Sequence, residues 1–161
     1  MPTSASQKVF IGADHRGFKL KNLIARQLQK EGYDVEDLGT FVPQPPCDYP
    51  KISDRLARKV VEHKAKGILI CLTGIGHCIA ANKIRGAYAA LCYTKRAAQL
   101  SRQHNNANVL VIGAKFVQKR EIAQIVRIWL KSEFAGGRHQ RRFRQIQEIE
   151  KKFFQDFEAS R

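Results

Sequence analysis

The sequence lacks any long run of apolar residues. None of its hydrophobic stretches approaches the roughly 20 residues that a membrane-spanning helix needs, so we expect no membrane segment. Residues 1–7 contain no apolar region of the kind found in signal peptides, and we expect them to form a loose tail. Proline is also scarce, whereas 43% of the residues are hydrophobic, which is typical of a globular chain. A length of 161 residues then predicts a single domain over 1–161.

Cysteine is sparse as well. There are four cysteines, at positions 47, 71, 78 and 92. They are too few to form a stabilising disulfide framework, and a domain with its own hydrophobic core does not need one. We therefore expect free thiols and a cytoplasmic location. No paired C-x-x-C spacing is present, which disfavours a zinc site built from His77, Cys78 and a distant partner. The sequence predicts no metal centre.

Acidic residues are few: the chain has 14 Asp and Glu but 29 Lys and Arg, which gives it a net charge of +15. Such a charge could indicate nucleic acid, an anionic surface or a small anionic substrate. Interleaved aromatic residues and a recognition-helix motif are missing, which disfavours nucleic acid. Most of the excess is spread along predicted helix faces, but residues 138–144 hold a dense cluster that could bind a phosphate.

Short apolar runs rich in β-branched residues alternate with amphipathic stretches. The runs are residues 9–11, 35–38, 67–72, 88–92 and 109–112, and the helical patterns cover about 17–31, 50–65, 76–84, 95–104 and 119–132. This alternation predicts right-handed βαβ units, and hence an α/β fold with a five-stranded parallel sheet covered on both faces.

A further helical pattern covers residues 139–157. Its apolar residues recur at steps of three and four, at Phe143, Ile146, Ile149, Phe153 and Phe157. Because the sheet already supplies a core, we expect this C-terminal helix to pack on a partner subunit.

In an open parallel sheet, ligands bind beyond the carboxyl ends of the strands. Residues 12–17 and 71–76 follow predicted strands directly, and residues 101–108 end the helix after the fourth strand. We expect all three segments on the same side of the sheet or on a helix end near it. The Gly74 and Gly76 turn could cradle an anion or could be only a tight corner, and the missing G-x-G-x-x-G fingerprint disfavours a dinucleotide.

Cys71 occupies the end of a strand just ahead of a helix, where the pKa of a thiol is lowered. The alternative interpretation is that Cys71 is a cysteine buried in the core. The Asp14-His15 pair could be a helix cap, and His104-Asn105 could be an ordinary helix end. Their joint placement after strands nevertheless favours a site.

Several segments of the sequence together resemble type B ribose-5-phosphate isomerases. They are residues 11–17, 48–50, 71–83, 100–108 and 136–140 with Arg142, among which IAANK at 79–83 and SRQHN at 101–105 are distinctive. The related galactose-6-phosphate isomerase subunits share much of the pattern. The resemblance runs in order over about residues 8–150, nearly the whole chain.

This resemblance implies a Rossmann-like three-layer sandwich and an enzyme of the pentose phosphate pathway with no metal or organic cofactor. It also implies a homodimer or dimer of dimers with shared active sites that bind a phosphorylated sugar, with no nucleic acid or membrane partner. The family's base corresponds to Cys71. Its ring-opening histidine, which comes from the partner subunit, corresponds to His104, and the amide that holds the enediolate corresponds to Asn105. The remaining site residues are Asp14 as the active-site aspartate, Thr73, Gly74 and Gly76 as the enediolate loop, and His15, Arg138 and Arg142 on the phosphate side.

The chemistry agrees with these residue types, since an aldose–ketose isomerase needs a base, a cradle for the enediolate, a ring-opening group and a phosphate anchor. We expect ribose 5-phosphate and ribulose 5-phosphate as the reactants. Allose or galactose 6-phosphate is an alternative substrate, and a non-catalytic sugar-phosphate binding protein is an alternative function.

Three positions depart from the family pattern. Leu72 stands where the family usually has glycine, which either strains the loop or leaves Leu72 in ordinary β geometry. His77 and Cys78 replace an apolar residue and a serine. Lys115 replaces a frequent arginine, which keeps the charge but loses its bidentate geometry.

Overall fold

A five-stranded parallel sheet forms the centre of the protein, which is described over residues 6–160 by a computed structural model. Its strands are β1 (Lys8–Ala13), β2 (Asp34–Asp37), β3 (Lys66–Cys71), β4 (Ala89–Leu91) and β5 (Val109–Gly113). Their order is β2-β1-β3-β5-β4, and every neighbouring pair is parallel, as the alternating pattern predicts. Residues 1–5 of the predicted tail lie outside the described part.

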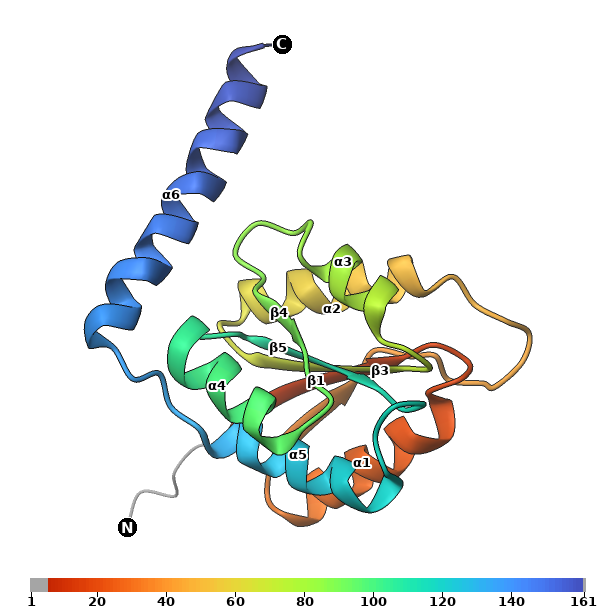
Figure 1. Cartoon of the computed structure of the whole chain (residues 1–161). Coiled ribbons are helices and arrows are strands. Elements are labelled where there is room, and N and C mark those ends of the chain that lie inside the picture. Colours follow the sequence, from red (N-terminus) through yellow and green to blue (C-terminus); the bar gives the residue numbers. More distant parts are fainter. Residues whose placement is uncertain (1–5, 161) are drawn as a thin grey trace.

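Helices cover both faces of this sheet and complete the three layers (Figure 1). On one face lie α1 (Phe18–Lys30), α4 (Lys95–Asn105) and α5 (Lys119–Lys131), and on the other lie α2 (Tyr49–Glu62) and α3 (Ile75–Ala81). Two apolar clusters fill the two interfaces, one with Trp129 from α5 and one with Leu56 from α2. The predicted α/β sandwich is confirmed.

Local sequence accounts for these elements. Residues 67–71 of β3 are all buried, which explains their unbroken apolar character in a central parallel strand. Helix α4 begins where the Thr94 side chain accepts a hydrogen bond of 3.1 Å from the Ala97 backbone N–H. Helix α3 ends at Ala81, three residues before the predicted end, and the Asn82 side chain that follows bonds both the carbonyl and the N–H of Ala89.

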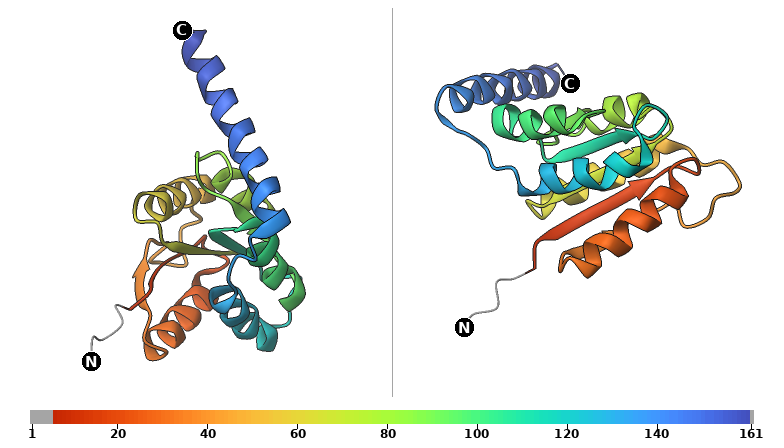
Figure 2. Two further views of the ribbon diagram at one scale, coloured as in Figure 1. Left: turned by 90° about the vertical axis from the view of Figure 1, so that its left-hand side faces the viewer. Right: turned by 60° about the horizontal axis from the view of Figure 1, so that its bottom comes forward.

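The last helix, α6 (Gly137–Ala159), extends away from the rest of the molecule (Figures 1 and 2). Near its start Phe143 is buried against Tyr88 and Phe134. Further along, Ile149 and Phe153 are 69% and 66% exposed, so these two residues of the predicted apolar stripe are left largely uncovered by residues 6–160. The side chain of Phe157 lies outside the described part. None of the helices within residues 6–160 is both long and apolar enough to span a membrane.

The sheet has a topological switch point between β1 and β3. After β1 the chain runs to β2 on one side, and it then crosses back to β3 on the other side of β1. Loops therefore leave these two carboxyl ends in opposite directions, and this is where open α/β sheets bind their ligands. Asp14 directly follows β1, and Cys71 is the last residue of β3.

Candidate active site

Asp14 and Cys71 meet at this switch point. The Cys71 Sγ donates to Asp14 Oδ2 across 3.2 Å, and both residues are buried. The other carboxylate oxygen, Oδ1, accepts from the backbone N–H groups of Arg16 (3.0 Å) and Gly17 (2.9 Å). The turn into α1 therefore holds the carboxylate in place against the thiol.

The pKa of Cys71 is raised above its usual 9.0, opposite to the predicted lowering. Burial is the main cause, because a thiolate there loses its hydration, and Asp14 raises the pKa further. Backbone N–H groups of Gly74 and Thr73 point at the sulfur and act in the other direction. In the protein without substrate, burial outweighs these two amides, so the thiol stays protonated.

The loop after Cys71 needs glycine at position 74 and not at position 72. Gly74 has φ of 82°, and a Cβ there would lie 2.6 Å from Leu91 Cδ1. Within residues 6–160, only Lys64 and Asn106 combine a side chain with positive φ, so Leu72 is free of that strain. Its carbonyl accepts from the Lys115 N–H at 2.9 Å, which extends the pairing of β3 with the chain after β5. This geometry supports the second of the two alternatives for Leu72.

Gly76 and His15 complete this edge of the site. A Cβ on Gly76 would lie 2.5 Å from the ring of Tyr49, so that close approach requires glycine. The half-buried His15 follows Asp14, and its Nδ1 accepts from the Cys47 N–H at 3.4 Å. Asp14, His15, Cys71, Thr73, Gly74 and Gly76 thus gather at the carboxyl edge of the sheet, as predicted.

His77 is a residue of this site that sequence reasoning did not assign to it. Its ring is fully buried, stands 5.4 Å from the Tyr49 ring, and shares a 2.6 Å hydrogen bond between Nδ1 and Ser53 Oγ. A His77 ring nitrogen, Cys71 Sγ and an Asp14 oxygen all lie within 4.8 Å of one another. Burial lowers the pKa of His77 to about 4, against a raising effect of Asp14, so the ring is neutral at neutral pH. The signal in the sequence is its departure from the family pattern.

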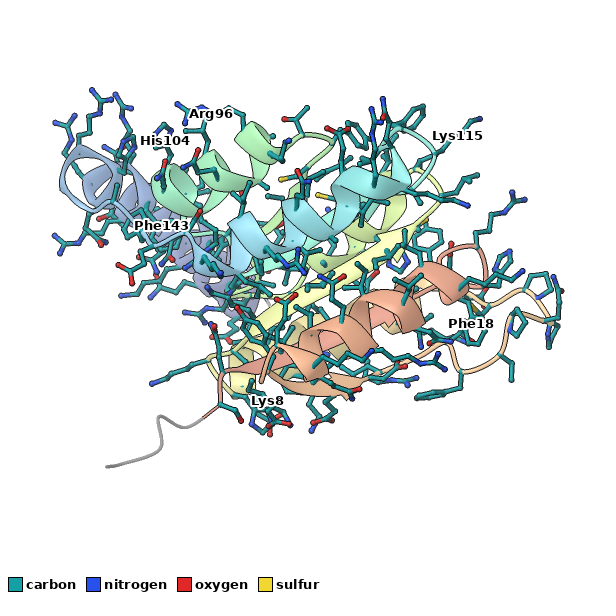
Figure 3. All side chains as sticks on the ribbon, turned by 90° about the horizontal axis from the view of Figure 1, so that it is seen from below. Lys8, Phe18, Arg96, His104, Lys115 and Phe143 are labelled. Carbon is teal, nitrogen blue, oxygen red and sulfur yellow. The ribbon has the colours of Figure 1, made fainter. Side chains whose placement is uncertain are left out.

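Residues 101–108 do not lie on the same side of the sheet as the other two segments, so that expectation is wrong within one chain. Helix α4 starts at the carboxyl edge after β4 and runs back to the amino end of β5, so His104 and Asn105 lie at the opposite edge. The Asn108 side chain bonds the backbone of Gly86 and Tyr88, just ahead of β4, which fixes this segment at the amino edge. Figure 3 shows His104 at one end of the molecule, with Lys115 and Phe18, which follow β5 and β1, at the other.

A second group of predicted residues gathers around His104. Its ring stacks on His139 of α6, with centroids 4.0 Å apart and an interplanar angle of 7°. Arg138 and Arg142 flank His139, are exposed, and stand four residues apart on one helix face. The pKa of His139 is lowered, first by loss of hydration and then by His104 and the two arginines. This edge therefore concentrates positive charge suited to a phosphate.

Comparison with known proteins identifies the family of this chain. The Ribose/Galactose Isomerase family profile matches residues 9–146. The chain is 45% identical to a probable ribose-5-phosphate isomerase B of Mycoplasma genitalium, over 91% of this chain and 97% of that protein. It is 42% identical to ribose-5-phosphate isomerase B of Escherichia coli, over 91% and 98% of the two chains.

A solved structure extends the similarity to three dimensions. Ribose-5-phosphate isomerase B of Mycoplasma genitalium with bound ribulose-5-phosphate superposes with a TM-score of 0.88 at 43% identity, covering 92% of this chain and 99% of that one. The fold, the sequence profile and these relatives agree over nearly the whole chain. We conclude that the protein belongs to the ribose/galactose isomerase family.

Proposed function

We propose that this protein is an aldose–ketose isomerase that interconverts ribose 5-phosphate and ribulose 5-phosphate through an enediolate, with Cys71 as the base. The observation that carries the proposal is the cluster at the switch point, where one buried thiol meets a fixed carboxylate and two backbone N–H groups. The similarity to a relative that holds ribulose-5-phosphate supports the choice of sugar.

The reaction moves one proton between neighbouring carbons. Cys71, as the thiolate, takes the proton from C2 of the open-chain aldose, and the electrons of that bond form the enediolate. The same thiol returns a proton to C1 while the proton of the C2 hydroxyl passes to the C1 oxygen, and the C2 carbonyl that forms gives the ketose. Asp14 orients the sulfur through its 3.2 Å contact.

The loop after Cys71 stabilises the charge that develops on the substrate oxygen. The backbone N–H groups of Thr73 and Gly74 already point toward the Cys71 sulfur, and the reacting carbon of the substrate must lie next to that sulfur. Fixed amides of this kind favour an oxyanion because they need no rearrangement during the reaction. Gly76, which has no side chain, allows the Tyr49 ring to pack directly against this loop.

We propose that a complete site needs two chains. His104, Asn105, Arg138 and Arg142 lie at the opposite edge of the sheet from Cys71 of the same chain. A homodimer or dimer of dimers brings the ring-opening His104 of the partner subunit to Cys71, and the arginines, with His15, bind the phosphate. The exposed stripe of α6, which spans the predicted interface segment 139–157, packs against the partner.

A coupled assay tests the proposal. The purified protein is given ribose 5-phosphate, allose 6-phosphate and galactose 6-phosphate in parallel, with Cys71→Ala as the matched control. We expect the highest kcat/KM on ribose 5-phosphate and no turnover by the variant. Preference for a six-carbon sugar would move the assignment to the galactose side of the family, and sugar binding without turnover would identify a binding protein.

A further inference from the structure

The cluster of Asp14, Cys71 and His77 offers three different ligand atoms to one point. A carboxylate oxygen, a thiol sulfur and an imidazole nitrogen lie within 4.8 Å of one another, and the sulfur and the oxygen are already 3.2 Å apart. All three residues are buried, with exposed fractions of 6%, 8% and 0%. Burial of three such groups together is unusual for residues that serve only packing.

His77 carries a polar atom that nothing in the described structure satisfies. Its Nε2 is buried and has no hydrogen-bond partner among residues 6–160. The hydroxyl of Ser53 lies 3.2 Å from the Tyr49 carbonyl oxygen and shares a 2.6 Å hydrogen bond with Nδ1 of His77. In the tautomer that carries its proton on Nδ1, the unpartnered Nε2 offers its lone pair to a ligand. An unpaired buried polar atom costs free energy unless a ligand meets it.

The groups behind the cluster resemble the outer shell of a metal site. Ser53 holds the His77 ring through Nδ1 and leaves Nε2 as the nitrogen without a partner, as second-shell groups do for metal-binding histidines. The N–H groups of Arg16 and Gly17 hold Asp14 Oδ1 and leave Oδ2 available. Two of the three ligands are thus oriented before any ion arrives.

We propose that Asp14, Cys71 and His77 bind a single zinc ion, which occupies the site in place of the substrate. Sulfur, nitrogen and oxygen donors together suit Zn²⁺, and three protein ligands leave its fourth position for water. Bond lengths of about 2.0–2.3 Å place tetrahedral donors roughly 3.3–3.8 Å apart, so the cluster needs to contract by about 1 Å. Binding forms an Sγ–Zn bond and releases the Cys71 proton to solvent, and the thiolate and carboxylate balance the charge of the ion.

The consequence is reversible inhibition by zinc. An ion held by Cys71 removes the proposed base, while its loss restores the thiol. The sequence predicts no metal centre, and this proposal departs from that prediction. The ion proposed here is an inhibitor and not a cofactor. It depends on His77, where the family commonly has an apolar residue, and its existence does not depend on the isomerase assignment.

Direct metal binding tests the site without reference to activity. The full chain, freed of metal by chelator treatment and of any purification tag, is titrated with Zn²⁺ against a competing indicator and with Co²⁺ by absorption. We expect one ion per chain and a thiolate-to-Co²⁺ charge-transfer band. His77→Leu should weaken binding at least about tenfold, and Cys71→Ser should abolish the band. Cys78→Ser and His63→Leu, which change the same residue types outside the cluster, should bind as the unmodified protein does.

Two results would overturn the proposal: no stoichiometric binding by the unmodified protein, or binding that survives both His77→Leu and Cys71→Ser. Circular dichroism checks that each variant folds, and His77→Gln, which keeps a polar side chain, replaces His77→Leu if that variant does not fold. The isomerase assay then measures inhibition, where zinc should slow the unmodified protein more than His77→Leu, each relative to its own zinc-free rate. An inactive protein that still binds one ion would contradict the proposed function and leave the zinc site intact.

Discussion

Cys71 is a protonated thiol in a position where a thiolate would be useful. Burial and Asp14 hold its pKa up, while the N–H groups of Gly74 and Thr73 favour the anion. Cys71 is the base that we propose, and another small side chain could supply the packing that it contributes.

We expect Cys71→Ala and Cys71→Ser to keep the fold and to abolish turnover, because loss of a general base alone lowers kcat by at least about a hundredfold. A serine hydroxyl is far too weak an acid to replace the thiol. Far-UV circular dichroism and the coupled assay on the same samples check both parts. Near-normal activity of Cys71→Ala would contradict the mechanism.

Leu72 is the second residue whose role is decided locally. It has no positive φ, and its carbonyl continues the pairing toward Lys115, so its backbone takes a conformation that needs no glycine. We expect Leu72→Gly to change kcat by less than about tenfold, or 1.4 kcal/mol of barrier. A rise of a hundredfold or more, measured in the same assay, would show that the native loop is impaired.

Among the elements, the junction of β3 and α5 contains a lysine that titrates in an accessible range. Lys66, at the start of β3, donates from Nζ to the Leu130 carbonyl at 2.6 Å and lies over the Trp129 ring. Its pKa is lowered from 10.5 to about 8, mainly by burial and next by Arg102. The charged form is therefore less favourable in the folded protein than in the unfolded chain.

This shift predicts how stability depends on pH. Between pH 8 and 10.5 the unfolded chain holds the Lys66 proton and the folded protein has lost it. The unfolded state binds more protons there, so this lysine makes the free energy of unfolding rise with pH through that window. Urea unfolding of the unmodified protein and of Lys66→Met, compared across the window, isolates the contribution. A pH-independent difference between the two proteins would contradict it.

At the scale of the whole molecule, the functional residues divide between the two edges of the sheet. Asp14 and Cys71 occupy the carboxyl edge, whereas His104 and Arg142 belong to the amino edge and α6. No rearrangement within one sandwich joins them, because the sheet itself lies between. The division is expected of a protein whose sites form where two copies meet.

We therefore expect complementation between two inactive variants. Mixing Cys71→Ala with His104→Ala should restore part of the activity after subunit exchange, because some hybrid dimers then hold one intact site. Each variant alone, carried through the same exchange, is the control. Exchange itself is verified with differently tagged chains, and no recovery after verified exchange would count against a shared site.

Much of the architecture was predictable from the sequence. The buried run of β3 and the apolar faces of the helices follow from period and composition, because a parallel strand covered on both faces must be apolar throughout. Asp14 and Cys71 could be placed together for the same reason, since each ends a strand and parallel strands end at one edge. The α6 stripe was visible as a repeat of apolar residues, and its partner stays a prediction.

Other features depend on the tertiary structure, because they involve distances between segments far apart in the chain. The sequence could not show that Ser53 of α2 bonds the His77 ring, nor that His77 lies close to Cys71 and Asp14. The direction of the Cys71 pKa was also beyond it, since a helix start favours the thiolate and only the packed site reveals how strongly burial opposes it. Period and residue type determined the fold and its candidate residues, whereas solvent exclusion and long-range contacts decided how those residues are charged and which of them meet.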